Sequence, residues 1–278
     1  MINFILDPLQ YAFMQRGLAA AILVGIVCAM VGTFVVLRGM AFFGDALAHS
    51  ILPGIAIGYL VSGGSQTALF WWGLVTAVLA SLGIGAVSKG AKLSDDTSTG
   101  IIFAGMFALG IALISRIGSY AVDLTHFLFG NVLAVSENDL LLTAILGGLV
   151  AFIIIIFYKE FMVLSFDPVL AATLRVPSKV LENLLLVLIA VTIVVSLQTV
   201  GIALMVAMLV TPAASAYLVT RRMHSMMILA SALAAVSAVL GLYTSFYFAI
   251  PSGASIVLVS TFLFLIIWAG KTVRQKSL

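Results

Sequence analysis

Residues 17–37 read GLAAAILVGIVCAMVGTFVVL and contain no charged side chain. An α-helix needs about 20 consecutive apolar residues to cross the hydrocarbon core of a bilayer. The stretch therefore predicts a membrane-spanning helix. Because Asp7 is the only charged residue before Arg16, this helix lacks the basic flank of a cleavable signal peptide, and we expect it to be retained.

The composition of the whole chain points the same way. Of its 278 residues, 63% are hydrophobic and 8% are charged, whereas a soluble domain of ordinary composition carries about 25% charged residues. This excludes a water-soluble fold and an attached ATPase domain. The net charge of +3 comes from basic residues scattered over short loops, so nucleic-acid binding is excluded as well. A single cysteine, Cys28, excludes an intramolecular disulfide and a multi-thiolate metal site.

Further apolar stretches follow residues 17–37. They predict an all-α polytopic membrane protein with about nine transmembrane helices, which we treat as a single transmembrane domain over residues 1–278. Gln198, Thr199 and Gly201 interrupt a run too long for one crossing, so we expect a tight turn there. The shorter apolar segment 124–135 is expected to be interfacial or re-entrant. The further spans are 40–62, 68–88, 98–115, 139–158, 180–199, 200–219, 226–248 and 253–270.

The distribution of lysine and arginine predicts the orientation, because positively charged loops stay in the cytoplasm. If the N-terminus is outside and the C-terminus is in the cytoplasm, Arg16 and Arg116 are the only basic residues that lie outside. The basic residues then inside are Arg38, Lys89, Lys92, Lys159, Arg175, Lys179, Arg221, Arg222, Lys271, Arg274 and Lys276.

Asp45 lies deep within an apolar span, and His49 follows four residues later. Residues i and i+4 share a face of a helix. An ionisable group inside a membrane helix costs at least about 2.5–3.5 kcal/mol and normally faces a cavity or a partner. The pair is therefore either a structural contact to a neighbouring helix or a transient divalent-metal site. Carboxylate oxygen with imidazole nitrogen suits manganese, iron and zinc better than calcium or magnesium.

A proline and two glycines follow His49 on the same predicted helix. Pro53 cannot donate an N–H to the carbonyl of His49, which would leave a backbone oxygen free beside the imidazole. Broken membrane helices often build ion sites in this way. Gly54 and Gly58 form a G-x-x-x-G motif on the side of the helix opposite Asp45 and His49. We expect that side to pack and the other side to be polar.

The longest cytoplasmic loop, residues 159–179, is named the coupling loop below. Asp167 followed by Pro168 predicts the start of a helix, and Pro177 prevents its continuation, so a short helix is expected over residues 168–175. This helix either lies on the membrane surface or inserts into a cytoplasmic partner. A partner is needed as an energy source, because the nearest approach to a phosphate-binding loop, residues 85–94, has Ala91 where the pattern requires lysine.

Five motifs in this order resemble the permease subunits of manganese, zinc and iron ABC importers, and the similarity covers nearly the whole chain. They are Phe43-Gly-Asp-Ala-Leu-Ala-His-Ser-Ile-Leu-Pro-Gly54, Phe127-Leu-Phe-Gly-Asn-Val-Leu-Ala-Val135, Ser165-Phe-Asp-Pro, Val210-Thr-Pro-Ala-Ala-Ser-Ala216 and Pro251-Ser-Gly-Ala254.

The resemblance implies a permease domain in the bacterial plasma membrane that is a homodimer with a pathway at its interface. It also implies two cytoplasmic ABC ATPase subunits and an extracytoplasmic metal-binding protein that delivers the ion. The chain is then no enzyme and holds no permanent cofactor, since ATP hydrolysis belongs to a separate chain and the metal is cargo. Asp45 and His49 match the metal-coordinating pair of the family.

By the same resemblance the coupling loop matches the helix that docks on the ATPase. Family members often have glycine where Arg175 stands here. The coupling residues are Asp167, Pro168, Val169, Leu170, Ala171, Ala172, Leu174 and Arg175.

The sequence His49-Ser-Ile-Leu-Pro-Gly is similar to the same segment in the manganese and iron members of the family, whereas zinc members tend to lack the proline. Manganese is therefore the transported metal that we expect first. The Irving–Williams order alone would favour zinc. Two other interpretations stay open from the residues themselves. One is a secondary transporter or channel that uses Asp45 and His49 as a relay without an ATPase. The other is an intramembrane enzyme built on the same pair.

Overall fold

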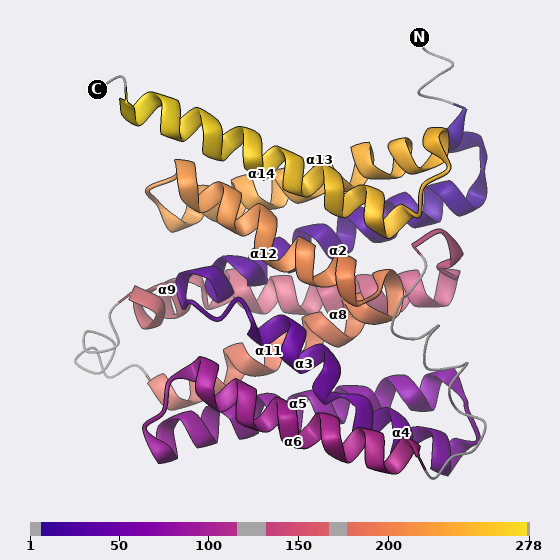
Figure 1. The fold of residues 1–278 in the computed structure, drawn as a ribbon, viewed down its shortest axis with the longest axis vertical. Helices are drawn as coiled ribbons and strands as arrows, with labels where there is room; N and C mark the ends of the chain where they lie inside the picture. The colour runs from indigo at the N-terminus through magenta and orange to yellow at the C-terminus, as the bar shows by residue number, and fades with distance from the viewer. Residues whose placement is uncertain (1–6, 116–131, 167–176, 277–278) are drawn as a thin grey trace. The chain divides into compact units, whose positions relative to one another are not determined.

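The computed structural model describes residues 7–115, 132–166 and 177–276 (Figure 1). Within these ranges, nine helices are long and apolar enough to span a membrane, which confirms the all-α architecture and the predicted number of spans. Eight of the nine spans are single helices: α2 (Ala12–Leu37), α5 (Gln66–Ala91), α6 (Asp95–Ile114), α8 (Glu137–Ile156), α11 (Ser178–Val200), α12 (Ile202–Val219), α13 (Met223–Phe248) and α14 (Ser252–Lys276).

The second span consists of two helices, α3 (Phe43–Ser50) and α4 (Leu52–Ser62). Shorter helices occupy connecting segments: η1 (Pro8–Gln10), η2 (Val132–Ala134) and α9 (Tyr158–Phe166). The predicted segment 124–135 lies largely outside the described residues, and only its end, which includes η2, is described.

The predicted turn between two consecutive spans is confirmed. α11 ends at Val200 and α12 begins at Ile202, with Gly201 between them at φ +81°. A side chain at this φ would be strained, which is why glycine suits the position. The N–H of Gly201 donates to the carbonyl of Leu197 at 3.0 Å, so the last turn of α11 is closed before the chain reverses.

The helices pack into two compact units. The first unit contains Met1–Val36, Leu128–Phe152 and Val195–Leu278, and the second contains Leu37–Phe127 and Ile153–Val194. Each unit is discontinuous in sequence, so its packing depends on contacts between helices far apart in the chain. The single domain over residues 1–278 stays a prediction.

Small residues allow the helices of the first unit to approach closely, as is common in membrane proteins. A Cβ added to Gly241 of α13 would lie 2.8 Å from the backbone nitrogen of Ile256 of α14. A Cβ on Gly17 of α2 would lie 2.9 Å from the carbonyl oxygen of Val132. Because both contacts involve backbone atoms, these positions exclude any larger side chain.

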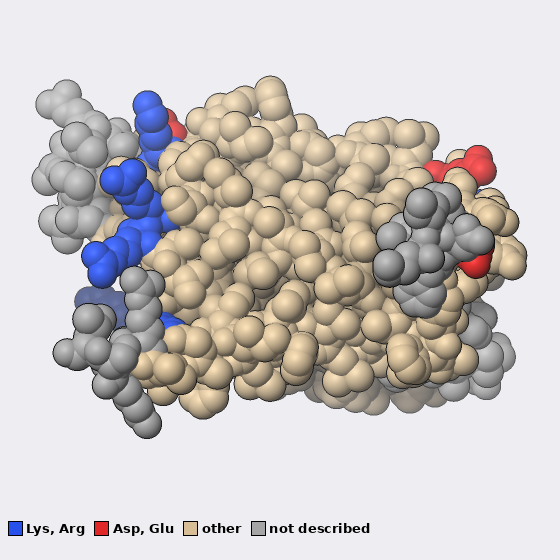
Figure 2. Space-filling model, turned by 90° about the horizontal axis from the view of Figure 1, so that it is seen from above, with Lys and Arg blue, Asp and Glu red and all other residues tan. Residues whose placement is uncertain are grey.

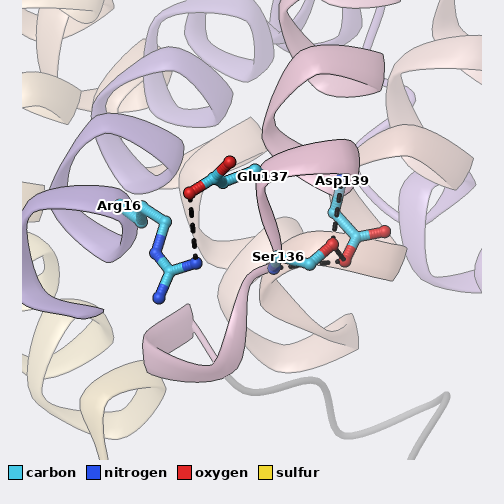
Figure 3. A network of polar contacts seen from close by, with 4 residues as sticks. All are labelled: Arg16, Ser136, Glu137 and Asp139. Carbon is cyan, nitrogen blue, oxygen red and sulfur yellow. Dashed lines mark hydrogen bonds and ion pairs between the residues drawn. The ribbon is translucent and has the colours of Figure 1, made fainter. Parts of the chain in front are cut away.

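Polar contacts gather where α2 and α8 begin (Figure 3). Ser136 caps α8: its hydroxyl accepts from the N–H of Asp139 at 3.1 Å and donates to the Asp139 carboxylate at 2.6 Å. The other carboxylate oxygen of Asp139 accepts from the side-chain amide of Gln198 at 2.8 Å. Arg16 of α2 lies 3.9 Å from the Glu137 carboxylate. Arg16, a cation predicted to lie outside, therefore faces an acidic partner.

Helix packing in the second unit fixes the position of α3. α3 packs on α5 and α6, and α4 packs on the same two helices. The G-x-x-x-G side of the helix packs, as predicted, and its partner is α5: a Cβ on Gly54 would lie 2.5 Å from the carbonyl oxygen of Trp72, and one on Gly58 would lie 3.2 Å from the Trp72 Cβ. On the α6 side, a Cβ on Gly110 would lie 2.6 Å from the Cβ of Leu52. The broken span is thus held between two helices.

Candidate functional site

The helix that carries Asp45 and His49 is short because the backbone turns at Ile51. Pro53 has no N–H for the carbonyl of His49, so α3 ends at Ser50 and α4 begins at Leu52 with the proline in its first turn. The N–H of Ile55 donates to the carbonyl of Ile51 at 3.1 Å and continues the chain into α4. The break therefore lies within one turn of His49.

The structure corrects one expectation from the sequence. The His49 carbonyl, expected to be free beside the imidazole, accepts a hydrogen bond from the N–H of Ile51. The local turn takes up the oxygen that Pro53 leaves without a donor. This carbonyl is therefore not a free third ligand.

Asp45 and His49 lie on one face of α3, as their spacing predicts. The Asp45 side chain is 42% exposed and the His49 side chain 31% exposed. The other residues of α3 are buried. The helix thus buries its apolar faces against its own unit and turns its two ionisable side chains outward.

The distance between the two side chains suits a shared ion better than a direct hydrogen bond. The Nε2 atom of His49 lies 3.8 Å from Oδ1 of Asp45, beyond hydrogen-bond distance. A transition metal binds imidazole nitrogen and carboxylate oxygen at about 2.0–2.2 Å each, which puts two ligand atoms of one ion roughly 3–4 Å apart. The 3.8 Å between the two atoms lies within this range.

Two phenylalanines of α6 form an aromatic wall beside the imidazole. The ring centroids of Phe103 and Phe107 lie 6.2 Å and 5.8 Å from that of His49, and the Phe107 ring is nearly perpendicular to the imidazole at 83°. The two phenylalanines also contact each other at 5.6 Å, and Phe42 contacts Phe103 at 6.1 Å. Contacts of this geometry are attractive and restrict the rotation of the imidazole.

This wall is not predictable from the sequence. Phe103 and Phe107 have the i, i+4 spacing of one helix face, but an apolar span gives no indication which face meets a histidine.

The part of the chain that the structure describes contains no group of three or more His, Cys, Asp and Glu residues able to hold a metal ion. The Asp45–His49 pair therefore supplies two side-chain donors. The predicted coupling residues, which run from Asp167 to Arg175, lie outside the described residues. On either side of them, α9 ends at Phe166 and α11 begins at Ser178.

Comparison with known proteins identifies relatives that match this chain over nearly the whole length of both proteins. The chain is 42% identical over 290 residues to the manganese transport system membrane protein MntC of Halalkalibacterium halodurans, a match that covers 99% of this chain and 98% of the relative. It is 46% identical over 263 residues to the protein of the same name from Listeria monocytogenes, with 95% and 92% covered.

A solved structure, "PsaBC from Streptococcus pneumoniae in complex with Fab", contains a chain with the same fold. The TM-score is 0.82 at 39% identity, and the match covers 96% of this chain and 95% of that chain.

The relatives and the apolar helices together make this chain a multi-pass protein of the plasma membrane. The sequence also matches the ABC 3 transport family over residues 10–271. This confirms the resemblance to ABC permease subunits that its motifs carry, and the chain belongs to the ABC 3 transport family.

Proposed function

We propose that the chain is the membrane-spanning permease of an ATP-driven importer of divalent transition-metal ions, with manganese as the cargo. The observation that carries the proposal is the outward-facing pair of Asp45 and His49, one turn apart at the break of a membrane span. The family match and the manganese transport relatives support the same function.

The Asp45 carboxylate and the His49 imidazole suit an ion that is bound only transiently during transport. A carboxylate oxygen and an imidazole nitrogen favour manganese, iron and zinc over calcium and magnesium. Each chain supplies only two donors, and waters in the positions that protein groups leave open keep the binding weak, so the ion is released quickly. His49 must be unprotonated to coordinate the metal, while Asp45 supplies the negative charge that offsets part of the loss of hydration.

A second copy of the chain would complete the site. In a twofold dimer that places α3 at its interface, each copy contributes one Asp45 and one His49, which gives four donors around the axis. The exposed face of α3 supports this arrangement, because its other faces are already packed within the chain. Transition-metal sites of mixed oxygen and nitrogen donors commonly have four or more ligands.

The energy and the metal come from other subunits in this proposal. Two cytoplasmic ABC ATPases dock on the coupling loop, and an extracytoplasmic protein delivers the ion. The metal preference then belongs to the delivery protein, because the Irving–Williams order favours zinc over manganese at an Asp–His site.

The test is uptake of manganese, iron and zinc into vesicles that contain the chain, its ATPase and its binding protein. We expect ATP-dependent uptake of manganese, and a loss of at least about tenfold in the Asp45→Asn variant, which keeps the shape but removes the charge. The matched control is Asp96→Asn, at an exposed carboxylate in the first turn of α6.

Co-purification of the ATPase with the Asp45→Asn variant excludes misfolding as the cause of a loss. Unchanged uptake in this variant would reduce the pair to a structural contact. Uptake that needs no ATP would replace the importer with a secondary transporter.

A further inference from the structure

Acidic residues lie at only one end of the first unit. Its aspartates and glutamates are Asp7, Glu137 and Asp139. Arg16, near the start of α2, lies 3.9 Å from the Glu137 carboxylate at the start of α8, so both helices begin at this end (Figure 3). The side chain of Gln198 donates to Asp139, which places the end of α11 and the start of α12 there as well.

Basic residues lie at the opposite end of this unit, and we name three of them the basic patch: Arg221, Arg222 and Lys271. α12 runs away from the acidic end, and the two arginines follow it directly before α13. α13 packs on both α12 and α14, returns to the acidic end, and α14 leads back again. Lys271, near the end of α14, therefore lies at the same end as the arginines. Figure 1 shows the start of α13 and the end of α14 at this end of the unit.

The packing of α13 on α14 puts Arg222 and Lys271 at nearly the same level. A Cβ on Gly241 would lie 2.8 Å from the backbone nitrogen of Ile256, so these two residues lie side by side. From this contact, at about 1.5 Å per residue, Arg222 is about 28 Å along α13 and Lys271 about 22 Å along α14. The two cations therefore differ by only about 6 Å along the helix axes, and the basic patch lies close to one membrane surface.

No carboxylate balances the basic patch. Residues 195–278 contain no aspartate or glutamate, and the ion pairs between described residues include none of the three patch residues. At the predicted cytoplasmic end of the second unit, by contrast, Lys89 pairs with Glu182 of α11, and Asp95 begins α6. The positive-inside rule counts lysine and arginine and depends little on acidic residues. Orientation therefore does not require the absence of acidic residues, and this absence suits the patch to an anionic partner.

The helix that carries Lys271 also exposes apolar side chains. Trp268 is 52% exposed and lies one turn before Lys271, at a spacing that makes the two residues neighbours on the helix surface. Tryptophan is enriched where a membrane helix meets the headgroup layer. Towards the middle of α14, four further large apolar side chains are exposed: Leu258, Phe262, Leu265 and Ile266. The basic patch thus follows directly on a surface suited to lipid acyl chains, at the depth of the lipid headgroups.

We propose that the basic patch binds the phosphate groups of anionic phospholipids, in the leaflet that the predicted orientation makes cytoplasmic. Arginine donates two parallel N–H groups to a phosphate, and lysine adds a compact positive charge. Basic residues directly beside a membrane helix strengthen the binding of anionic lipid by about fivefold for each side chain. The exposed apolar side chains of α14 favour a lipid over an acidic protein surface as the partner. The binding requires neither a metal nor an ATPase, so the inference is independent of the function proposed above.

The experiment uses Trp268 as a reporter of the lipid beside the basic patch. In a Trp71→Phe, Trp72→Phe background it is the only tryptophan, and lipids with brominated acyl chains quench tryptophan fluorescence on contact. The full chain is placed in bilayers of phosphatidylcholine and phosphatidylglycerol with one or the other lipid brominated, and the two quenching curves give the relative affinity. We expect phosphatidylglycerol to bind at least about fivefold more tightly than phosphatidylcholine. In the double variant Arg222→Gln, Lys271→Gln we expect this preference to fall below about twofold.

Two matched variants control for charge and for folding. Lys92→Gln, Lys159→Gln removes the same charge from exposed side chains of the second unit and is expected to keep the preference. Arg222→Lys, Lys271→Arg preserves the charge of the patch and is also expected to keep it, and unfolding temperatures in detergent show that each variant is folded. Equal affinity for the two lipids in the reporter background would overturn the inference. A neutral patch that keeps the preference but no longer co-purifies with the ATPase would assign the patch to the ATPase instead.

Discussion

Asp45 and His49 differ from the other charged residues of the chain in their surroundings. Charges in loops meet water, but these two side chains lie within an apolar span, where contact with lipid would cost at least about 2.5–3.5 kcal/mol for the carboxylate. The structure leaves them 42% and 31% exposed on an otherwise buried helix. Such a face is stable only against water or another protein surface, and the transport pathway proposed above would provide that environment.

The role of the aromatic wall beside His49 can be tested separately. Replacing Phe107 by alanine removes the ring that lies edge-on to the imidazole, so we expect manganese uptake to fall by about two- to tenfold because His49 is less well oriented. Leu109→Ala on the same helix, at a 50% exposed side chain, is the control. The measurement is the initial rate of uptake over a range of metal concentrations. A loss as complete as that of Asp45→Asn, or no loss at all, would contradict a role in orientation.

At the scale of helices, the broken second span combines two kinds of residue. Pro53 ends α3 one turn after His49, and the small residues Gly54 and Gly110 let α4 approach α5 and α6 to backbone distance. Close packing of this kind takes the place of the hydrophobic effect between helices in a membrane. The Asp45–His49 pair is therefore positioned by a rigid support.

This support can be tested with two glycine substitutions. A Cβ on Gly54 would lie 2.5 Å from the Trp72 carbonyl, so we expect Gly54→Ala to destabilise the protein by about 1–3 kcal/mol. Gly83 of α5 has no atom within 4 Å of an added Cβ, so Gly83→Ala is expected to be neutral or to stabilise by up to about 1 kcal/mol. Thermal unfolding in detergent measures the difference. Equal unfolding temperatures for the two variants would contradict the close packing of α4.

The sequence predicted the elements better than their contacts. Hydropathy located the spans because each is close to the length that a bilayer requires, and Gly201 marked the turn between α11 and α12. The Asp45–His49 pair was visible because both residues lie on one helix. The contact between Lys89 and Glu182 joins helices far apart in the chain, and no local pattern encodes such a pairing. The Ile51 hydrogen bond to His49 was missed for a similar reason, since it depends on the backbone angle at the break.

At the scale of the whole molecule, charge is distributed by sign. On the face shown in Figure 2, lysine and arginine side chains lie together, and most of the visible aspartate and glutamate lie apart from them. In the first unit, Arg221 and Arg222 precede α13, while Glu137 and Asp139 lie in the first turn of α8. Arg16 departs from this pattern, because it is a cation beside the acidic first turn of α8. The nearby Glu137 carboxylate offsets the charge of Arg16. This distribution supports the predicted orientation, in which basic loops lie in the cytoplasm.

Cysteine labelling tests the orientation directly. Cys28 is the only cysteine and is fully buried, so a Cys28→Ala background permits single cysteines at exposed positions that leave the charges unchanged. Asn138→Cys in the first turn of α8 and Ser225→Cys in the first turn of α13 are such positions. In intact cells we expect a membrane-impermeant maleimide to label the first and not the second, and permeabilised cells to be labelled at both. The opposite pattern would reverse the orientation, and with it the side from which an ATPase could reach the coupling loop.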